Sequence, residues 1–131
     1  MKRTVLLAFA AALLLSTLVA CAAPTTGTAA FQKITPQDAK TRLDSDKSIV
    51  LVDVRTQEEY DQSHIAGALL LPVDMISTKA VHVLLDKNAT YFVYCRSGNR
   101  SATAARTLAD LGFTEIYDLG GIQDWPYETV R

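Results

Sequence analysis

The chain has 131 residues, a hydrophobic content of 49% and a formal net charge of −1, which is enough for one domain with a packed core. Without the first 20 residues it keeps 11 basic and 14 acidic side chains, a net charge of −3, and it has no lysine or arginine run. This charge pattern excludes nucleic acid as the expected partner, because phosphates require a concentrated positive surface. Small solutes or proteins are the expected partners.

The N-terminus has the pattern of an export signal. Lys2 and Arg3 form a basic head, residues 5–15 are apolar, and small residues lead to Cys21, an order typical of a secretory signal peptide. The segment Leu18-Val19-Ala20-Cys21 resembles the lipobox of bacterial lipoproteins. That resemblance implies cleavage before Cys21 and a diacylglycerol on its sulfur.

We therefore expect a signal peptide at residues 1–20, a flexible tether at 21–30 and the folded domain at 31–131. The protein would be exported to the periplasmic side of the cell envelope and anchored in the membrane through lipidated Cys21. An ordinary cleaved signal and an uncleaved anchor are the alternatives. The anchor is disfavoured because Ser16 and Thr17 interrupt an apolar run that is already short for spanning a bilayer.

Strand and helix patterns alternate along the domain. The apolar run at residues 49–52 predicts a strand buried on both faces, and Thr56 with Glu59 forms a capping box that opens a helix. Strands are expected at residues 31–34, 49–52, 69–71, 91–94 and 115–118, with helices from Pro36, from residue 57, at 74–85, at 101–111 and near Trp125, and a turn at Gly120-Gly121. The alternation predicts an α/β domain with a mainly parallel central sheet and helices on both faces.

The segment Cys95-Arg96-Ser97-Gly98-Asn99-Arg100 joins a predicted strand to a predicted helix. Free N–H groups of such a loop and of the first helical turn converge and bind anions. Cys95 would lie at the rim of this cradle as a nucleophilic thiolate, favoured by the helix N-terminus and by the two arginines. The flexible Gly98 permits the turn, and Ser97 and Asn99 supply polar groups.

The loop has a simpler interpretation, in which Cys95 is an inert core cysteine. Two arginines within five residues argue against it, since inert apolar sites are not surrounded by arginine. Arg96 is expected to meet the charge of a substrate, whereas Arg100 is expected to fix the loop by pairing with an acid such as Asp53. No metal is expected, because there is no CxxC motif and no Cys/His cluster with ligand spacing.

Three motifs together resemble the signatures of the rhodanese family. They are Leu51-Val52-Asp53-Val54-Arg55 with Glu58-Glu59-Tyr60 and His64-Ile65-Ala66-Gly67-Ala68, then Tyr94–Ser101, and finally Leu119-Gly120-Gly121-Ile122 with Trp125. The resemblance spans residues 32–126 and implies a single rhodanese domain without a metal or organic cofactor. It also implies that Cys95 is catalytic, that residues 96–100 and Arg55 bind substrate, and that Asp53 gives structural support.

The resemblance implies a ping-pong sulfurtransferase. A small sulfur-containing anion such as thiosulfate would donate its sulfane sulfur to Cys95, and a thiol or cyanide would accept it from the resulting persulfide. One alternative is a non-enzymatic persulfide carrier or binding module on the same scaffold. Another is a phosphatase or arsenate reductase, whose loops have a Cys-x5-Arg pattern, whereas this loop has Cys95-x4-Arg100. The oligomeric state is left open.

Overall fold

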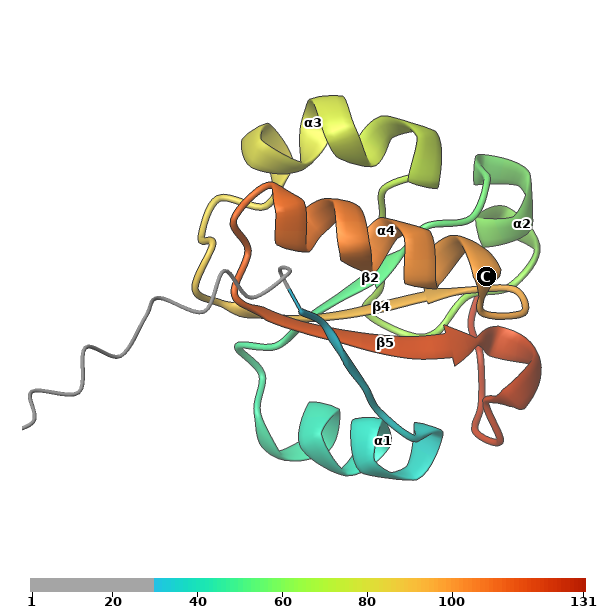
Figure 1. Cartoon of the computed structure of the whole chain (residues 1–131). Helices are drawn as coiled ribbons and strands as arrows, with labels where there is room; N and C mark the ends of the chain where they lie inside the picture. The colour runs from blue at the N-terminus through green and yellow to red at the C-terminus, as the bar shows by residue number, and fades with distance from the viewer. Residues whose placement is uncertain (1–29) are drawn as a thin grey trace, which may run out of the picture.

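The computed structural model describes residues 30–131 (Figure 1). The predicted signal peptide, Cys21 and nearly all of the predicted tether lie outside the described residues. In chain order the elements are β1 Gln32–Lys33, α1 Pro36–Ser45, β2 Val50–Asp53, α2 Gln57–Gln62, β3 Leu69–Leu70, η1 Val73–Met75, α3 Ile76–Val83, β4 Thr90–Cys95, α4 Asn99–Asp110, β5 Glu115–Gly121 and η2 Ile122–Asp124. No helix within residues 30–131 is long and apolar enough to cross a membrane.

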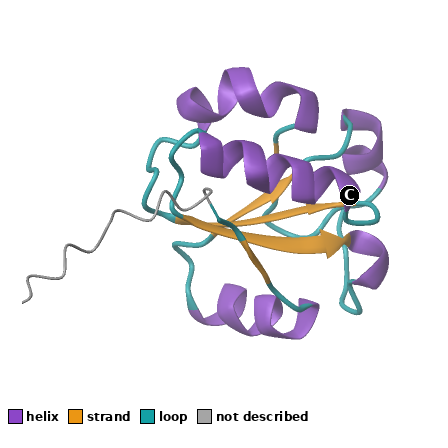
Figure 2. Cartoon of the chain, viewed as in Figure 1, coloured by secondary structure: helices purple, strands orange, loops and turns teal. Residues whose placement is uncertain are grey.

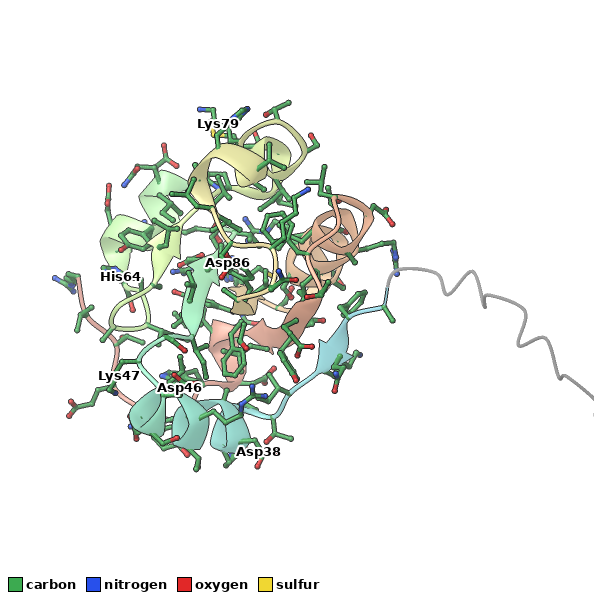
Figure 3. The ribbon with its side chains drawn as sticks, turned by 90° about the vertical axis from the view of Figure 1, so that its left-hand side faces the viewer. Asp38, Asp46, Lys47, His64, Lys79 and Asp86 are labelled. Carbon is green, nitrogen blue, oxygen red and sulfur yellow. The ribbon has the colours of Figure 1, made fainter. Side chains whose placement is uncertain are left out.

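The strands form one five-stranded sheet in the order β1-β5-β4-β2-β3, and every neighbouring pair is parallel. Helix α1 covers one face, while α3 and α4 cover the other (Figures 1 and 2). A view turned by 90° shows Asp38 of α1 and Lys79 of α3 on opposite sides of the sheet (Figure 3). The predicted α/β class and parallel sheet are confirmed.

The central strand β4 divides its side chains between two core clusters. Tyr91, Val93 and Cys95 belong to the cluster shared with α3 and α4, whereas Phe92 and Tyr94 belong to the cluster shared with α1. Successive side chains of a strand point to opposite faces, and here both faces are covered. This two-sided burial accounts for the unbroken apolar sequence of the strand.

Two helix starts follow the predicted capping signals. The Thr35 side chain accepts a hydrogen bond from the Asp38 N–H at 3.1 Å, and Pro36 occupies the first helical turn of α1. At the start of α2, the Glu59 N–H donates to Thr56 Oγ1 at 3.3 Å and the Thr56 N–H donates to Glu59 Oε2 at 3.0 Å. Each cap gives a partner to an N–H group that the helix itself leaves free.

The predicted turn at Gly120-Gly121 is wrong, because both residues belong to β5. The strand pairing shifts its register between Val93 and Tyr94 of β4, and Gly120 takes up the irregularity at φ +84°. Such a bulge lets a strand continue with a local bend. As a result β5 extends far enough for Gly121 to pair with Cys95.

Candidate active site

A short loop at the end of β4 forms a cradle around the sulfur of Cys95. Cys95 ends the strand and α4 begins at Asn99, two residues before the predicted start. Gly98 adopts φ +103°, a conformation that glycine takes at little cost. This conformation lets the Gly98 N–H donate to Cys95 Sγ at 3.1 Å.

The pKa of the Cys95 thiol is lowered by hydrogen bonds from this cradle. Burial is the largest single influence and raises the pKa, since only 1% of the residue is exposed. The backbone N–H groups of Ser101, Gly98 and Ser97, together with the Ser101 hydroxyl, outweigh burial. The predicted contribution of the helix N-terminus agrees with these hydrogen bonds, whereas neither arginine is among the largest influences on the pKa of Cys95.

Arg100 forms an ion pair with Glu59, so the predicted pairing with Asp53 is wrong. Its two terminal nitrogens donate to the two carboxylate oxygens of Glu59 at 2.7 and 2.8 Å. This fork geometry is the strongest form of the arginine–carboxylate interaction, and it lowers the pKa of Glu59 to about 2. Because Glu59 also caps α2, the pair ties the first turn of α4 to that helix.

Asp53 instead binds Arg55, two residues further along the chain. Arg55 Nε donates to Asp53 Oδ1 at 2.9 Å, and Nη2 donates to Oδ2 at 2.6 Å and to the Ser63 carbonyl at 2.7 Å. Both members of the ion pair are buried. Asp53 is thus placed to give structural support, and the close pairing leaves Arg55 with little free charge.

The residues flanking Cys95 open onto two hollows on the surface. A groove of about 510 Å³ is lined in part by Arg55, Arg96 and Trp125. A second hollow of about 350 Å³ is lined in part by Ser97, Gly98 and Asn99. Within the described residues Arg96 takes part in no ion pair, so its charge is available to an anion that enters the groove.

Ser101 and Asp118 belong to the site and were not predicted. The Ser101 hydroxyl donates to Asp118 Oδ1 at 2.6 Å and lies 3.0 Å from the Gly98 carbonyl oxygen. The sequence does hold a signal for Asp118. Asp118 ends the predicted strand at residues 115–118, and polar side chains at the carboxyl ends of parallel strands converge. In the structure β5 continues beyond this residue to Gly121.

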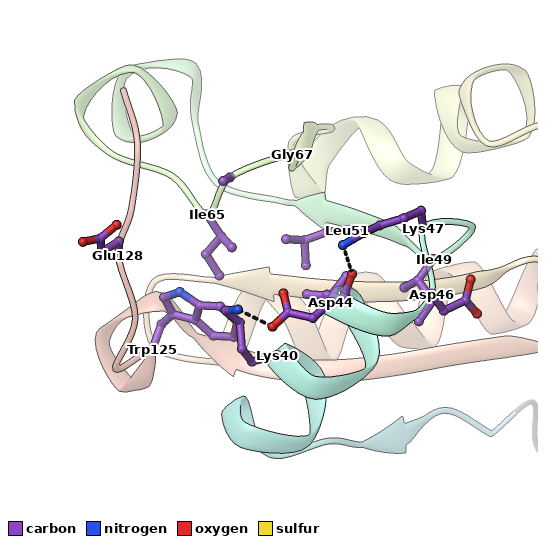
Figure 4. Close-up of a pocket in the computed structure, with 12 residues that line it drawn as sticks. Lys40, Asp44, Asp46, Lys47, Ile49, Leu51, Ile65, Gly67, Trp125 and Glu128 are labelled. Atoms are coloured by element: carbon purple, nitrogen blue, oxygen red, sulfur yellow. Dashed lines mark hydrogen bonds and ion pairs between the residues drawn. The ribbon is translucent and has the colours of Figure 1, made fainter.

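A third hollow lies on the α1 side of the sheet (Figure 4). It has a volume of about 440 Å³ and is lined in part by Lys40, Leu51, Ile65 and Trp125, with no cysteine, histidine or serine in its lining. The side chain of His64 packs elsewhere, since its ring stacks on that of Tyr60 with the two ring centroids 3.7 Å apart. Residues 30–131 contain no group of three or more potential metal ligands.

Comparison with known proteins places this geometry in a family. The model of the "Rhodanese-like domain" family matches residues 35–127. The "Thiosulfate sulfurtransferase PspE" of Escherichia coli is 36% identical over 80 residues, which are 61% of this chain and 77% of PspE. The "Putative sulfur carrier protein YrkF" of Bacillus subtilis is 36% identical over 91 residues, or 69% of this chain, which spans only 48% of YrkF.

A solved structure agrees with these sequence relatives. The structure described as "rhodanese with anions from E. coli" has a TM-score of 0.60 and 32% sequence identity, and the match covers 63% of this chain and 98% of that one. The family match extends from the cap of α1 to beyond η2 and includes the whole Cys95 cradle. The chain therefore belongs to the rhodanese-like domain family.

Proposed function

We propose that this protein is a sulfurtransferase that moves a sulfane sulfur through a persulfide on Cys95. The donor is thiosulfate or a related small sulfur-containing anion, and the acceptor is a thiol or cyanide. One observation carries the proposal: the Gly98 N–H points at Cys95 Sγ from 3.1 Å, within a loop whose hydrogen bonds lower the pKa of the thiol. A thiolate held in this way is a nucleophile.

In the first half-reaction the Cys95 thiolate attacks the outer sulfur of thiosulfate. A new S–S bond forms on Cys95, the S–S bond of thiosulfate breaks, and sulfite leaves with its electron pair. The cation of Arg96 lines the groove from which the dianion enters. The persulfide then carries its negative charge on the terminal sulfur, where the N–H groups of the cradle stabilise it.

In the second half-reaction the acceptor attacks the terminal sulfur of the persulfide. With cyanide the products are thiocyanate and the Cys95 thiolate, and the electron pair of the broken S–S bond returns to Cys95. Arg100 takes no direct part, because Glu59 holds both of its terminal nitrogens. Its role is to fix the first turn of α4, which supplies the Ser101 N–H to the sulfur.

A persulfide carrier is the second candidate. It is favoured by the relative YrkF, whose name is that of a sulfur carrier protein. A carrier requires the same cradle but receives its sulfur from another protein, so thiosulfate would load it poorly. The two candidates share the Cys95 persulfide and differ in the donor.

The test is the intact mass of the purified full chain before and after thiosulfate, and again after cyanide. We expect a gain of one sulfur atom, mapped by peptide analysis to Cys95 and removed by cyanide with release of thiocyanate. The Cys95→Ser variant keeps nearly the same shape but lacks the thiolate, so it should gain no sulfur and release no thiocyanate.

The controls separate the candidates. Sulfur transfer by Cys95→Ser at the wild-type rate would disprove the mechanism through a Cys95 persulfide. An intact, alkylatable Cys95 that gains no sulfur from thiosulfate but gains it from a loaded cysteine desulfurase would favour the carrier. In full chain produced without lipoprotein processing, Cys21 keeps its thiol and serves as an internal reference, because a sulfur gain at both cysteines would indicate unspecific chemistry.

We also propose that the protein acts outside the cytoplasm as a lipoprotein. The support is the basic head, the apolar run and the lipobox-like segment ending at Cys21. Lipidation would remove the thiol of Cys21 and leave Cys95 as the single thiol of the mature chain. Persulfide chemistry would then proceed without competition from an intramolecular disulfide.

A further inference from the structure

A buried hydroxyl–carboxylate pair, Ser101 with Asp118, lies beside the cradle, and the reaction described above gives Asp118 no role. Ser101 is fully buried and Asp118 is 5% exposed. Within residues 30–131 Asp118 takes part in no ion pair. It is held by the Ser101 hydroxyl at 2.6 Å and by the Gly120 N–H at 3.0 Å. Burying a carboxylate without a cation is costly, so its position calls for an explanation.

The pair is connected to the reacting sulfur through a single residue. Ser101 Oγ lies 3.0 Å from the Gly98 carbonyl oxygen, and the N–H of the same Gly98 donates to Cys95 Sγ. The Gly120 carbonyl oxygen lies 3.3 Å from Ser101 Oγ. A serine hydroxyl has one proton to donate, yet several acceptors surround this one. The direction in which the Ser101 hydroxyl donates therefore depends on which acceptor is the most negative.

We propose that the Ser101 hydroxyl alternates between Asp118 and the anionic sulfur of Cys95, with Asp118 as the positioning residue that acts through it. While Cys95 is a neutral thiol, the hydroxyl donates to Asp118. When the sulfur becomes a thiolate or persulfide, the hydroxyl turns to it, and Asp118 keeps the Gly120 N–H. No proton is transferred and no covalent bond breaks. The inference rests on the proposed function, because that function supplies the anionic sulfur.

The electrostatics of the site agree with this arrangement. The hydroxyl and the N–H of Ser101 both lower the pKa of Cys95. Of the other charged groups, Arg100 interacts electrostatically with Cys95 and is itself paired with Glu59 of α2, while Arg96 follows Cys95 in the loop and the Asp53–Arg55 pair lies at the end of β2. These groups stay unchanged when Ser101 or Asp118 is substituted, so a shift in the titration of Cys95 can be assigned to the pair.

The experiment measures the rate of iodoacetamide alkylation of Cys95 against pH in the full chain, with the Cys95 peptide quantified by mass spectrometry. Ser101→Ala removes a donor to a charged sulfur and should raise the midpoint by about one pH unit. Asp118→Asn keeps an oxygen that accepts from Gly120 but competes less for the hydroxyl and removes a negative charge. It should therefore lower the midpoint.

The matched control is Thr103→Ala, which removes an exposed hydroxyl from the same helix and should leave the midpoint unchanged. The double variant, with both Ser101→Ala and Asp118→Asn, completes a double-mutant cycle. If Asp118 acts through Ser101, Asp118→Asn lowers the midpoint less in the Ser101→Ala background than in the wild type. This dependence on the background is an outcome that a purely structural role, or the loss of the Asp118 charge alone, would not produce.

The proposal is overturned if Ser101→Ala leaves or lowers the midpoint, or if Asp118→Asn shifts it equally in both backgrounds. Should Ser101→Ala fail to fold, a midpoint of Asp118→Asn at or above the wild-type value overturns it alone. Failure of the proposed function is seen separately, as the absence of sulfur gain on wild-type Cys95. That absence leaves the alkylation midpoints, and hence this test, intact.

Discussion

The shape of the cradle depends on glycine at position 121, because there is no space for a side chain there. A Cβ atom at this position would lie 2.4 Å from the Arg96 carbonyl oxygen and 2.8 Å from Ser97 Cα. Its φ of −106° is one that any residue adopts. Glycine is therefore required here because β5 and the loop approach closely, and the reason is not backbone strain. The neighbours are backbone atoms, which cannot move without moving the cradle.

We expect Gly121→Ala to displace the backbone at Arg96 and Ser97 and to reduce sulfur transfer from thiosulfate about 100-fold, as small misplacements of catalytic groups do. The measurement is kcat/KM for thiocyanate formation, beside denaturant unfolding. Gly67→Ala is the matched control. Gly67 has φ +80°, and a Cβ added there would meet no atom within 4 Å, so alanine should cost about 1 kcal/mol of stability and little activity. Equal losses of activity in both variants would contradict the argument.

At the scale of elements, Glu59 connects α2 to the active-site helix. One carboxylate completes the capping box with Thr56 and also binds both terminal nitrogens of Arg100. Its pKa is lowered from 4.5 to about 2 in the folded protein. A lowered pKa means that the ionised form stabilises the fold. That stability is fully present above about pH 4.5 and is lost as the pH falls towards 2.

Glu59→Gln should therefore destabilise the protein by about 1 kcal/mol near neutral pH, since the ion pair is partly exposed to solvent. The difference from the wild type should shrink below about pH 4.5 and be small near pH 2, where about half of the Glu59 carboxylates of the folded wild type are protonated. Urea unfolding over this range measures it. The neighbouring exposed Glu58→Gln is the control and should show a much smaller loss. A difference in the free energy of unfolding that stays constant with pH would contradict the link between the Glu59 charge and stability.

Those parts of the fold that rest on local signals could be predicted from the sequence. The caps at Thr35 and Thr56 and the apolar run of β4 depend on residues close together in the chain, and the structure confirms them. The errors concern contacts between distant segments. The partner of Arg100 comes from α2, 41 positions earlier in the chain, and the bulge at Gly120 arises only when β5 meets β4.

The candidate site likewise has one part that local sequence predicts and another that depends on contacts between distant segments. The cradle of residues 95–100 is contiguous, so its anion-binding character could be read from one motif. The Ser101–Asp118 pair joins residues 17 positions apart, and no local pattern shows that these two side chains meet. Nor does the sequence show that these N–H groups influence the pKa of Cys95 more than the two arginines do. That conclusion depends on the direction of backbone bonds, which only the folded loop defines.

At the scale of the whole molecule, the parallel sheet itself assembles the site. All five strands run in one direction, so their carboxyl ends meet at one edge of the sheet. Asp53 and Cys95 end β2 and β4, and Asp118 lies in the middle of β5. Helix α4 then returns over the sheet and directs its free N–H groups to the same edge. The architecture thus supplies both the nucleophile and its stabilising donors.

The proposed lipid anchor makes a prediction for the full chain in a bacterial host that processes lipoproteins. After feeding with an alkyne-tagged fatty acid, the wild-type protein should carry the label and sediment with membranes, because buried acyl chains contribute about 0.8 kcal/mol per CH₂. Cys21→Ser should lose both properties. Cys95→Ser is the matched control, since it removes the other cysteine of the chain, and it should keep both.

The other outcomes identify the remaining possibilities for the N-terminus. An unlabelled wild-type protein that is shortened and soluble in the periplasm indicates an ordinary cleaved signal. An unlabelled protein of full-length mass in the membrane fraction indicates an uncleaved anchor. Either membrane-bound form, lipidated or uncleaved, would confine a sulfur-carrying thiol to the membrane surface, whereas a cleaved soluble form would not. The label therefore decides which compartment should be searched for the physiological donor and acceptor.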